Sequence, residues 1–464
     1  MFKKTFQLLL PSVLLMLILA SPVSAQFYRQ VNLVSDISGM AAVTDPLLVN
    51  PWGMSSSPMS PLWTSNQVSG TATLYSIDGV TGAVTKVPLN VTIPGPPTGQ
   101  LFNGSPNFVV SSGGASGPAL FIFAALNGTI SGWNPGVPPP PRSTHAILAA
   151  TGSPAPVAYT GLTWAVRGSD PFLYAANNAT GHIDVYNKTY TKAAVPGTFT
   201  DPALPAGDLA FNVVNIGGNL FVTYSGPTGV VNVFDPDGHF VKRFATGGTL
   251  VNPWGIAVAP DGFGEFSNAV LIGNFNFGDP SKGPGSISAF DFSTGAFLGR
   301  LEDTAGTPIS IDGLWALKFG NGQKGGISNV LYFTAGIQKQ THGLLGRLAA
   351  CGVTLSDVSA SPNVLWPPNH KMVPVAINYD AADDCDPAPV CSLSVTSNEG
   401  EGGGSGHTSP DWMVIDAHHE SLRAERAGSG SGRVYTTTIS CQDKLGLTAG
   451  AAVDVVVPHN PGKK

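Results

Sequence analysis

Short apolar runs, separated by turns rich in glycine and proline, repeat along the first three quarters of the chain. Leu, Val, Ile, Phe and Tyr dominate runs such as 120–123, 172–175, 220–223 and 330–333. Short apolar runs that are bounded by such turns are typical of buried strands. The runs recur roughly every 45 to 60 residues between residues 26 and 348. The pattern therefore predicts an all-β protein built from repeated units.

A doubled hexapeptide helps to define the units. The sequence Leu-Val-Asn-Pro-Trp-Gly occurs at 48–53 and again at 250–255, which are 202 residues apart. It marks the start of the first strand in units one and five of a predicted six. In unit two we expect this strand at 106–109. The residues that open the six innermost strands are expected to be Asn50, Asn103 or Asn107, Thr160, Asp208, Asn252 and Asp312.

The ends of the repeat region predict closure into a ring. Four units finish with an outer strand, such as 239–244, but the sixth unit has none before the chain moves on near Arg347. Residues 27–33 alternate correctly and belong to no unit, so we expect them to supply the missing strand. An open solenoid is the alternative, but it leaves backbone groups bare at both edges. The prediction for residues 26–348 is a six-bladed β-propeller.

The sequence changes character at Cys351. Strands are expected at 353–356, 372–378 and 453–457. The runs 420–426 and 433–440 flank a Gly/Ser segment and predict a hairpin. Roughly seven strands in about 110 residues fit a small immunoglobulin-like β-sandwich over residues 349–464.

Composition limits the class of partner. Of the 464 residues, 11% are charged, compared with roughly 25% in typical soluble domains. The 57 glycines and 39 prolines suit many short strands joined by tight turns. The net charge is −6, and no basic stripe is present to follow a phosphate backbone, so a nucleic-acid partner is not expected.

The N-terminus predicts export. Lys3 and Lys4 precede an apolar stretch at 8–20, and Val-Ser-Ala at 23–25 forms a small-residue cleavage site, so residues 1–25 are interpreted as a signal peptide. An uncleaved membrane anchor is the alternative, but the stretch contains Pro11 and is short for a span. We expect a secreted or cell-surface protein without a stable membrane anchor.

The cysteine pattern agrees with export. The chain has four cysteines, all in the last quarter: Cys351, Cys385, Cys391 and Cys441. An even set in one small exported module predicts two disulfides, with three pairings possible. A zinc site is the alternative, and the irregular spacing argues against it.

Several segments resemble known families. Residues 50–53, 102–108, 252–255, 311–315 and 333–336 resemble exported bacterial six-bladed propellers of the NHL-repeat and TolB-like type, a family of unknown function. The resemblance implies the fold and export, but no reaction. In the tail, 365–375, 384–387 and 423–426 resemble hyalin-repeat and related immunoglobulin-like modules, which implies adhesion or spacing. The tail departs from that pattern at 443–447.

Two sets of oxygen ligands are candidate metal sites. In a propeller the residues that open the innermost strands converge on one end of the channel, where Asn50, Asp208, Asn252 and Asp312 could hold Ca²⁺. The preferred alternative is that these side chains bond their own turn backbone. The second candidate Ca²⁺ site is in the tail and consists of the carboxylates of Asp383, Asp384 and Asp386.

The histidines do not form a recognisable site. His407 and the run His418-His419-Glu420 are interpreted as surface residues, because neighbours on a strand point to opposite faces. The propeller histidines are expected in turns or outer strands: His145, His182, His239 and His342.

These observations favour a binding protein over an enzyme. The sequence contains no Gly-x-Ser-x-Gly elbow, Walker loop or His-Glu-x-x-His. The recurring Trp52, Trp164, Trp254 and Trp315 are expected to pack between blades, with a carbohydrate platform as the alternative if some rings face solvent. The main hypothesis is an exported binding or scaffolding protein whose propeller loops present a protein or carbohydrate ligand site. The alternative is a lactonase-like, metal-dependent hydrolase at the channel mouth.

Overall fold

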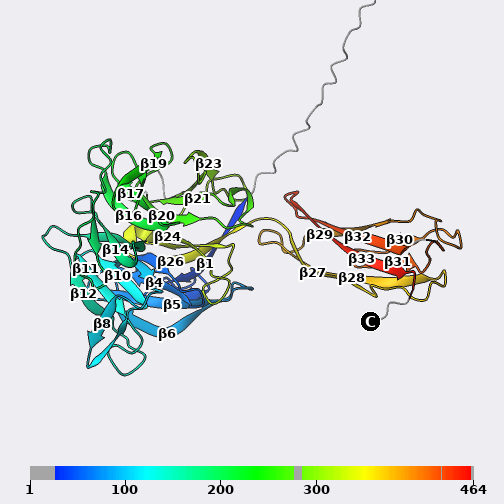
Figure 1. Cartoon of the computed structure of the whole chain (residues 1–464), viewed down its shortest axis with the longest axis horizontal. Coiled ribbons are helices and arrows are strands. Elements are labelled where there is room, and N and C mark those ends of the chain that lie inside the picture. The colour runs from blue at the N-terminus through cyan, green and yellow to red at the C-terminus, as the bar shows by residue number, and fades with distance from the viewer. Residues whose placement is uncertain (1–26, 276–284, 430, 461–464) are drawn as a thin grey trace, which may run out of the picture.

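The computed structural model describes residues 27–275, 285–429 and 431–460, and these residues are almost entirely β-structure. Figure 1 shows a rounded array of sheets joined to an elongated two-layered tail. The predicted signal peptide, residues 1–25, lies outside the described residues. Among the described residues no helix has the length and apolar character needed to cross a bilayer.

The rounded part consists of six sheets, or blades, that follow one another along the chain. Blade 1 contains β3 (Pro51–Ser55), β4 (Leu62–Asn66), β5 (Thr71–Ile77) and β6 (Val84–Thr92). Blade 2 contains β7 (Pro97–Phe102), β10 (Phe121–Ala125), β11 (Thr129–Trp133) and β12 (Ile147–Thr151), with the hairpin β8 (Val109–Ser112) and β9 (Ala115–Pro118) in its first loop. Blade 3 contains only β13 (Tyr159–Arg167), β14 (Asp170–Asn177) and β15 (His182–Tyr186).

The other three blades complete the array. Blade 4 contains β16 (Leu209–Ile216), β17 (Asn219–Ser225), β18 (Val230–Phe234) and β19 (Phe240–Thr246). Blade 5 contains β20 (Pro253–Val258), β21 (Val270–Asn274), β22 (Ile287–Phe290) and β23 (Phe297–Arg300), with the 3₁₀ turn η1 (Gly264–Phe266). Blade 6 contains β24 (Leu314–Phe319), β25 (Leu331–Ala335) and β26 (Leu344–Ala350), with the short α1 (Ile337–Gln340) between the last two.

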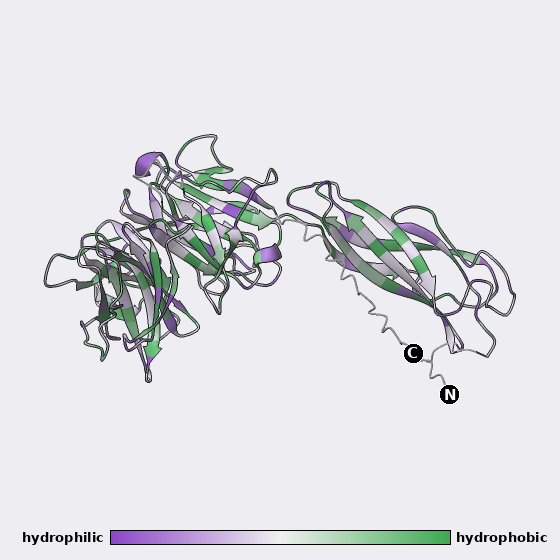
Figure 2. Ribbon diagram, turned by 90° about the horizontal axis from the view of Figure 1, so that it is seen from above, coloured by the Kyte–Doolittle hydropathy of each residue, from purple (hydrophilic) through white to green (hydrophobic). Residues whose placement is uncertain are grey.

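The innermost strands form a closed ring. Each innermost strand contacts the next one around the ring, in the order β3, β7, β13, β16, β20, β24, and β24 also contacts β3. Each of these six strands is an edge strand of its sheet. One edge of each strand is therefore unpaired within the sheet, and this edge faces the axis. Apolar clusters fill the spaces between blades, and Figure 2 shows the apolar positions within the blades. The predicted six-bladed propeller is confirmed.

The ring is closed by the N-terminal strand, as predicted. Strand β1 (Tyr28–Ser35) pairs antiparallel with β26 and is the fourth strand of blade 6, while β2 (Val43–Thr44) extends the edge. Tyr28 is only 1% exposed and stacks against Phe263 and Phe266 of blade 5. Its hydroxyl donates to the Phe263 carbonyl at 3.1 Å. Strand β1, at the start of the propeller, thus joins its last two blades.

The innermost strand of blade 2 differs from the prediction. It lies at β7, several residues before the expected 106–109. Asn103 follows the strand and folds the next residues into a turn, accepting from the Ser105 N–H at 3.1 Å and donating to the Asn107 and Ala119 carbonyls. The strand was missed because proline and glycine interrupt the apolar pattern before Gln100. Neither Asn103 nor Asn107 therefore opens an innermost strand.

The tail is a sandwich of two sheets. One sheet has the order β27 (Thr354–Ser361), β28 (Met372–Ala382), β31 (His419–Arg423), β30 (Trp412–Val414); the other has β29 (Val390–Ser397), β32 (Gly432–Gln442), β33 (Thr448–Pro458). The hairpin predicted between 420–426 and 433–440 is wrong, because β31 and β32 belong to different sheets. Both edges of each strand are already paired with other partners, so the Gly/Ser segment crosses between the layers.

Two disulfides stabilise the tail, as expected from its four cysteines. Cys351 bonds to Cys385, which joins the start of the tail to the loop after β28. Cys391 bonds to Cys441, and these residues lie directly opposite each other on β29 and β32. The structure thus selects one of the three possible pairings.

Candidate functional site

Aromatic rings fill the propeller axis near the starts of the innermost strands. Trp52 of blade 1 stacks on Trp315 of blade 6, with ring centroids 3.7 Å apart, and lies 6.5 Å from Phe211 of blade 4. Blades 1 and 4 are opposite each other in a ring of six, so the last contact crosses the axis. Trp254 and Phe275 of blade 5 complete this aromatic plug, at 5.8 and 4.1 Å from Trp315.

The structure places the four tryptophans in two environments. The three that belong to the plug are between 1% and 6% exposed, so core packing is confirmed for them. Trp164 is partly buried and packs against the cluster between blades 2 and 3. Phe211 and Phe275 were not singled out in the sequence, because neither lies in the Asn-Pro-Trp-Gly motif.

The two asparagines of the repeated motif connect neighbouring blades. Both have positive φ, 47° at Asn50 and 43° at Asn252, a conformation that asparagine tolerates well. The Asn50 Oδ1 accepts from Trp315 Nε1 at 2.9 Å, which joins blade 1 to blade 6. The Asn252 Oδ1 accepts from the Gly226 N–H at 3.1 Å, which joins blade 5 to blade 4. Each motif therefore fixes a turn and ties its blade to the preceding one.

The two predicted carboxylates of the channel have different surroundings. Asp312 is exposed, and its Oδ2 accepts from the Gln338 N–H at 2.8 Å. Asp208 is 4% exposed; its Oδ1 accepts from the Thr228 N–H, and its Oδ2 has no hydrogen-bond partner among the described residues. Burial raises the pKa of Asp208. None of the recorded hydrogen bonds joins Asp208, Asp312 and the two asparagines, and calcium binding here stays a prediction.

Beyond the plug, toward the ends of the innermost strands, the axis is hollow. A cavity of about 420 Å³ is lined by residues of all six innermost strands, among them Met54, Gln100, Thr163, Asn215 and Val258. Because the free edges of the same strands face the axis, backbone N–H and C=O groups are available there. Among the described residues, those that line the cavity include no Asp, Glu, His or Cys.

Lys318 on β24 is the one charged residue among the described residues that line the cavity. Within the described residues no hydrogen bond or ion pair involves its ammonium group, and burial lowers its pKa. Sequence analysis did not identify Lys318 as a candidate. The available signal was a lysine inside the otherwise apolar strand Leu-Trp-Ala-Leu-Lys-Phe.

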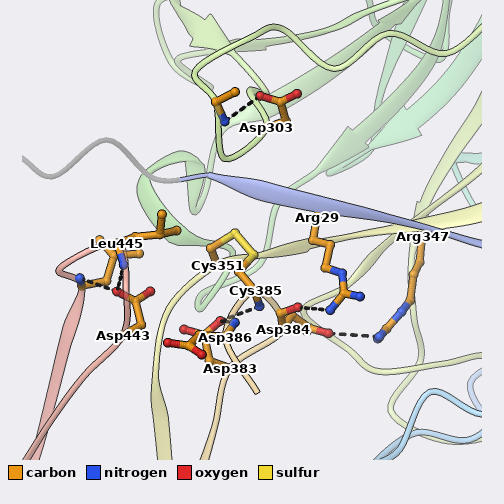
Figure 3. Close-up of a disulfide and its surroundings, with 12 residues drawn as sticks. Arg29, Asp303, Arg347, Cys351, Asp383, Asp384, Cys385, Asp386, Asp443 and Leu445 are labelled. Atoms are coloured by element: carbon orange, nitrogen blue, oxygen red, sulfur yellow. Dashed lines mark hydrogen bonds and ion pairs between the residues drawn. A yellow bond between two sulfur atoms is a disulfide. The ribbon is translucent and has the colours of Figure 1, made fainter. Parts of the chain in front are cut away.

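The predicted tail carboxylates lie beside the Cys351–Cys385 disulfide at the start of the tail (Figure 3). Asp384 faces the propeller: its carbonyl accepts from Arg29 at 2.5 Å, and its Oδ1 accepts from Arg347 at 3.0 Å. Asp386 accepts from the Lys444 N–H at 2.9 Å, and such backbone hydrogen bonds lower its pKa. Asp383 accepts from the N–H groups of residues 385 and 386. The three side chains therefore have separate sets of contacts.

Asp383 instead interacts with Asp443, a residue that the metal prediction did not include. The Oδ2 atoms of both carboxylates are buried, and neither has a hydrogen-bond partner among the described residues. Burial and the Asp443 carboxylate raise the pKa of Asp383. Within the described residues no three His, Cys, Asp or Glu side chains group as a metal site. Calcium binding by the tail also stays a prediction.

The surface interpretation holds for the tail histidines but not for Glu420. His419 pairs with Asp416 at 2.9 Å and is largely exposed, and the His418 ring stacks on Tyr379. Glu420 is buried and accepts from the Thr437 hydroxyl at 2.8 Å. It was wrongly placed because alternation turns it toward the core between the sheets.

Two proteins of Acanthamoeba polyphaga mimivirus match most of this chain. The uncharacterized protein R648 is 31% identical over 337 residues, which covers 68% of this chain and 78% of R648. The uncharacterized protein L690 is 30% identical over 337 residues, which covers 68% of this chain and 84% of L690. No family model matches the chain.

Two solved structures show a low similarity. The β-propeller domain of Cps50 (Swd1) from Myceliophteria thermophila has a TM-score of 0.37 and 12% identity, covering 64% of this chain and 83% of that one. A putative 6-phosphogluconolactonase from Bacteroides uniformis has a TM-score of 0.33 and 15% identity, covering 55% of this chain and 70% of that one. The propeller assignment rests on the strand order and the ring of contacts described above.

Proposed function

We propose that this chain, which belongs to the family of the mimivirus proteins R648 and L690, is an exported binding protein. Its ligand site is the end of the propeller where the innermost strands finish. The observation that supports this proposal is the axial cavity, which six strands line and the aromatic plug closes from behind. A concave site with mixed apolar and polar lining is typical of small-molecule recognition.

Binding suits this cavity better than hydrolysis does. Its lining offers amide, hydroxyl and apolar groups together with one ammonium, but no carboxylate or imidazole to act as general base or metal ligand. At the other end, the Asp208 and Asp312 side chains bond to different backbone groups. The hydrolase alternative therefore has the weaker support.

Export is the cellular setting that we propose for this site. Two disulfides, Cys351–Cys385 and Cys391–Cys441, are the bonds expected in an oxidising compartment. Arg29 and Arg347 contact Asp384 beside the first of them, so the tail is attached where the propeller ring closes. We propose that the tail serves as an adhesive or spacer module for the propeller.

The test uses methyl NMR on the full mature chain labelled at methionine. Met54 is 8% exposed and lines the cavity, whereas Met59, in the same blade, is 73% exposed and lies outside it. Titration with phenylacetate and with the neutral phenylacetamide is expected to shift the Met54 methyl resonance saturably for at least one compound. The Met59 resonance should remain in place.

A matched pair of variants assigns the signal to the cavity. Val258 lines the cavity and is 37% exposed, so Val258→Trp places a ring at its rim, while Val241→Trp alters an outer strand at a position that is 52% exposed. Binding should be lost in Val258→Trp and kept in Val241→Trp. If neither compound shifts Met54, or if both variants bind equally, the cavity is not the binding site and the proposal is wrong.

A further inference from the structure

The cavity has an unbalanced charge. Lys318 is the one charged residue in its lining, and within the described residues its ammonium group has no hydrogen-bond or ion-pair partner. An unpaired cation in a partly desolvated position is costly, and an opposite charge nearby relieves that cost. No carboxylate from the lining residues supplies it.

The other polar groups of the lining are largely committed to the fold. Asn212 Nδ2 donates to the Trp254 carbonyl at 2.7 Å, and Asn215 Nδ2 donates to the Trp164 carbonyl at 2.8 Å. Gln100 Nε2 donates to two carbonyls of blade 1. The lysine ammonium, the Thr163 hydroxyl and the free strand edges are therefore among the donors left for a ligand.

Comparison among the blades shows that the lysine is an exception within the repeat. Counting three residues from the plug tryptophan leads to Ser55 in blade 1, Ala257 in blade 5 and Lys318 in blade 6. The repeat itself therefore needs no charge at this position. A charge placed in only one of these three blades breaks the symmetry of the channel and gives a ligand one preferred orientation.

We propose that the cavity binds a small organic anion, a carboxylate or a phosphate monoester, whose charged group pairs with Lys318. This inference rests on the proposed function, and it adds the chemical class of the ligand. The apolar lining near Leu162 and Ile256 accommodates the uncharged part of the molecule. Charge-assisted hydrogen bonds from a lysine to such anions are about twice as strong as neutral ones.

The experiment compares ligands that differ only in charge. Dissociation constants are measured by the same methionine NMR titration for phenylacetate, phenyl phosphate and phenylacetamide at constant ionic strength. The wild-type protein should bind at least one of the anions about 10- to 100-fold more tightly than the amide, the effect expected of one hydrogen-bonded charge pair. The preferred anion distinguishes a carboxylate ligand from a phosphate ligand.

Three variants decide whether Lys318 is responsible. Lys318→Met should abolish the preference for anions while amide binding persists, and Lys318→Arg should keep the preference. Lys324→Met, which removes an exposed lysine outside the cavity, should behave like the wild type. Because methionine removes a partly buried charge without an ion-pair partner among the described residues, the first variant is expected to fold, and its circular dichroism spectrum checks this.

The outcomes separate the two proposals. If anions and amide bind equally to the wild type, or if Lys318→Met keeps the preference, the cavity is a binding site but the anion inference is wrong. If none of the three compounds shifts the Met54 resonance, the proposed function itself fails.

Discussion

The aromatic plug allows the energetic role of one hydrogen bond to be isolated by two matched substitutions. Trp52 and Trp315 stack on each other, and both are buried. Trp315 Nε1 donates to Asn50 Oδ1 at 2.9 Å, whereas Trp52 Nε1 has no hydrogen-bond partner among the described residues. Trp52→Phe and Trp315→Phe therefore remove similar ring surface, but only the second leaves a buried acceptor without its donor.

The expected difference follows from these contacts. Each substitution loses roughly 50 Å² of buried ring surface, worth about 1 kcal/mol of unfolding free energy. Trp315→Phe loses a further 1–3 kcal/mol or so, because the Asn50 oxygen stays buried without a donor. For the roughly 320 residues between Tyr28 and Ala350, the unfolding entropy is about 0.7 kcal/mol/K. A difference of about 2 kcal/mol then lowers Tm by about 3 °C more in Trp315→Phe than in Trp52→Phe.

The assay is differential scanning calorimetry of the full mature chain with its disulfides intact. Trp366→Phe, at a tail position that is 46% exposed, serves as the control and should change stability by less than about 0.5 kcal/mol. Equal losses in the two plug variants, or a larger loss in Trp52→Phe, would refute the assigned role of the Asn50 hydrogen bond.

Two further predictions concern titratable groups in the tail. Asp443→Asn should raise the free energy of unfolding by roughly 1 kcal/mol at pH 7 and by almost nothing at pH 3. The pKa of Asp383 is raised, so its protonation stabilises the fold at low pH and is lost as pH rises, when the Asp443 carboxylate begins to repel it. Urea unfolding at both pH values tests this, and an equal effect at both would contradict it. Burial of Glu425 raises its pKa, but hydrogen bonds from Thr408, His370 and a backbone N–H outweigh this and lower the pKa to about 2. The free energy of unfolding should therefore fall by about 3 kcal/mol as pH drops from 4.5 toward 2. Glu425→Gln should make the free energy of unfolding depend less on pH in this range. An acid transition that is the same in the variant and the wild type would contradict the prediction.

The propeller could be predicted because its signals are local and repeated. Short apolar runs between turns mark many of the strands, and the doubled Asn-Pro-Trp-Gly motif gives the same turn twice. The closing strand β1 could be predicted because the sixth repeat unit has no outer strand of its own, whereas residues 27–33 form a strand pattern that belongs to no unit. Strand β7 was not, since proline and glycine hide its pattern and its place is set by the strands on either side.

The contacts of the candidate sites depend on long-range packing, which a single sequence does not reveal. Asp383 and Asp443 are 60 residues apart, and only the sandwich topology brings their carboxylates together. The crossing from β31 to β32 has the same origin: the intervening Gly/Ser segment is compatible with a hairpin or a crossover, and pairing with other strands decides between them. Lys318 lies in an apolar strand, and only the ring shows that this strand lines a cavity.

The repeated motif also determines which half of the channel can receive a ligand. It places Trp52 and Trp254 near the axis at equivalent positions, and Trp315 occupies the corresponding position in blade 6 without the Asn-Pro dipeptide. The three indoles contact one another near the strand starts, and the remaining space lies beyond them, toward the strand ends. Ala257 lines that space without a charge, and Ser55 at the corresponding position of blade 1 is also uncharged, whereas Lys318 makes one side of the space positive. The repeated strands thus form the cavity, and Lys318, which differs from the equivalent residues of blades 1 and 5, gives the cavity its proposed preference for anions.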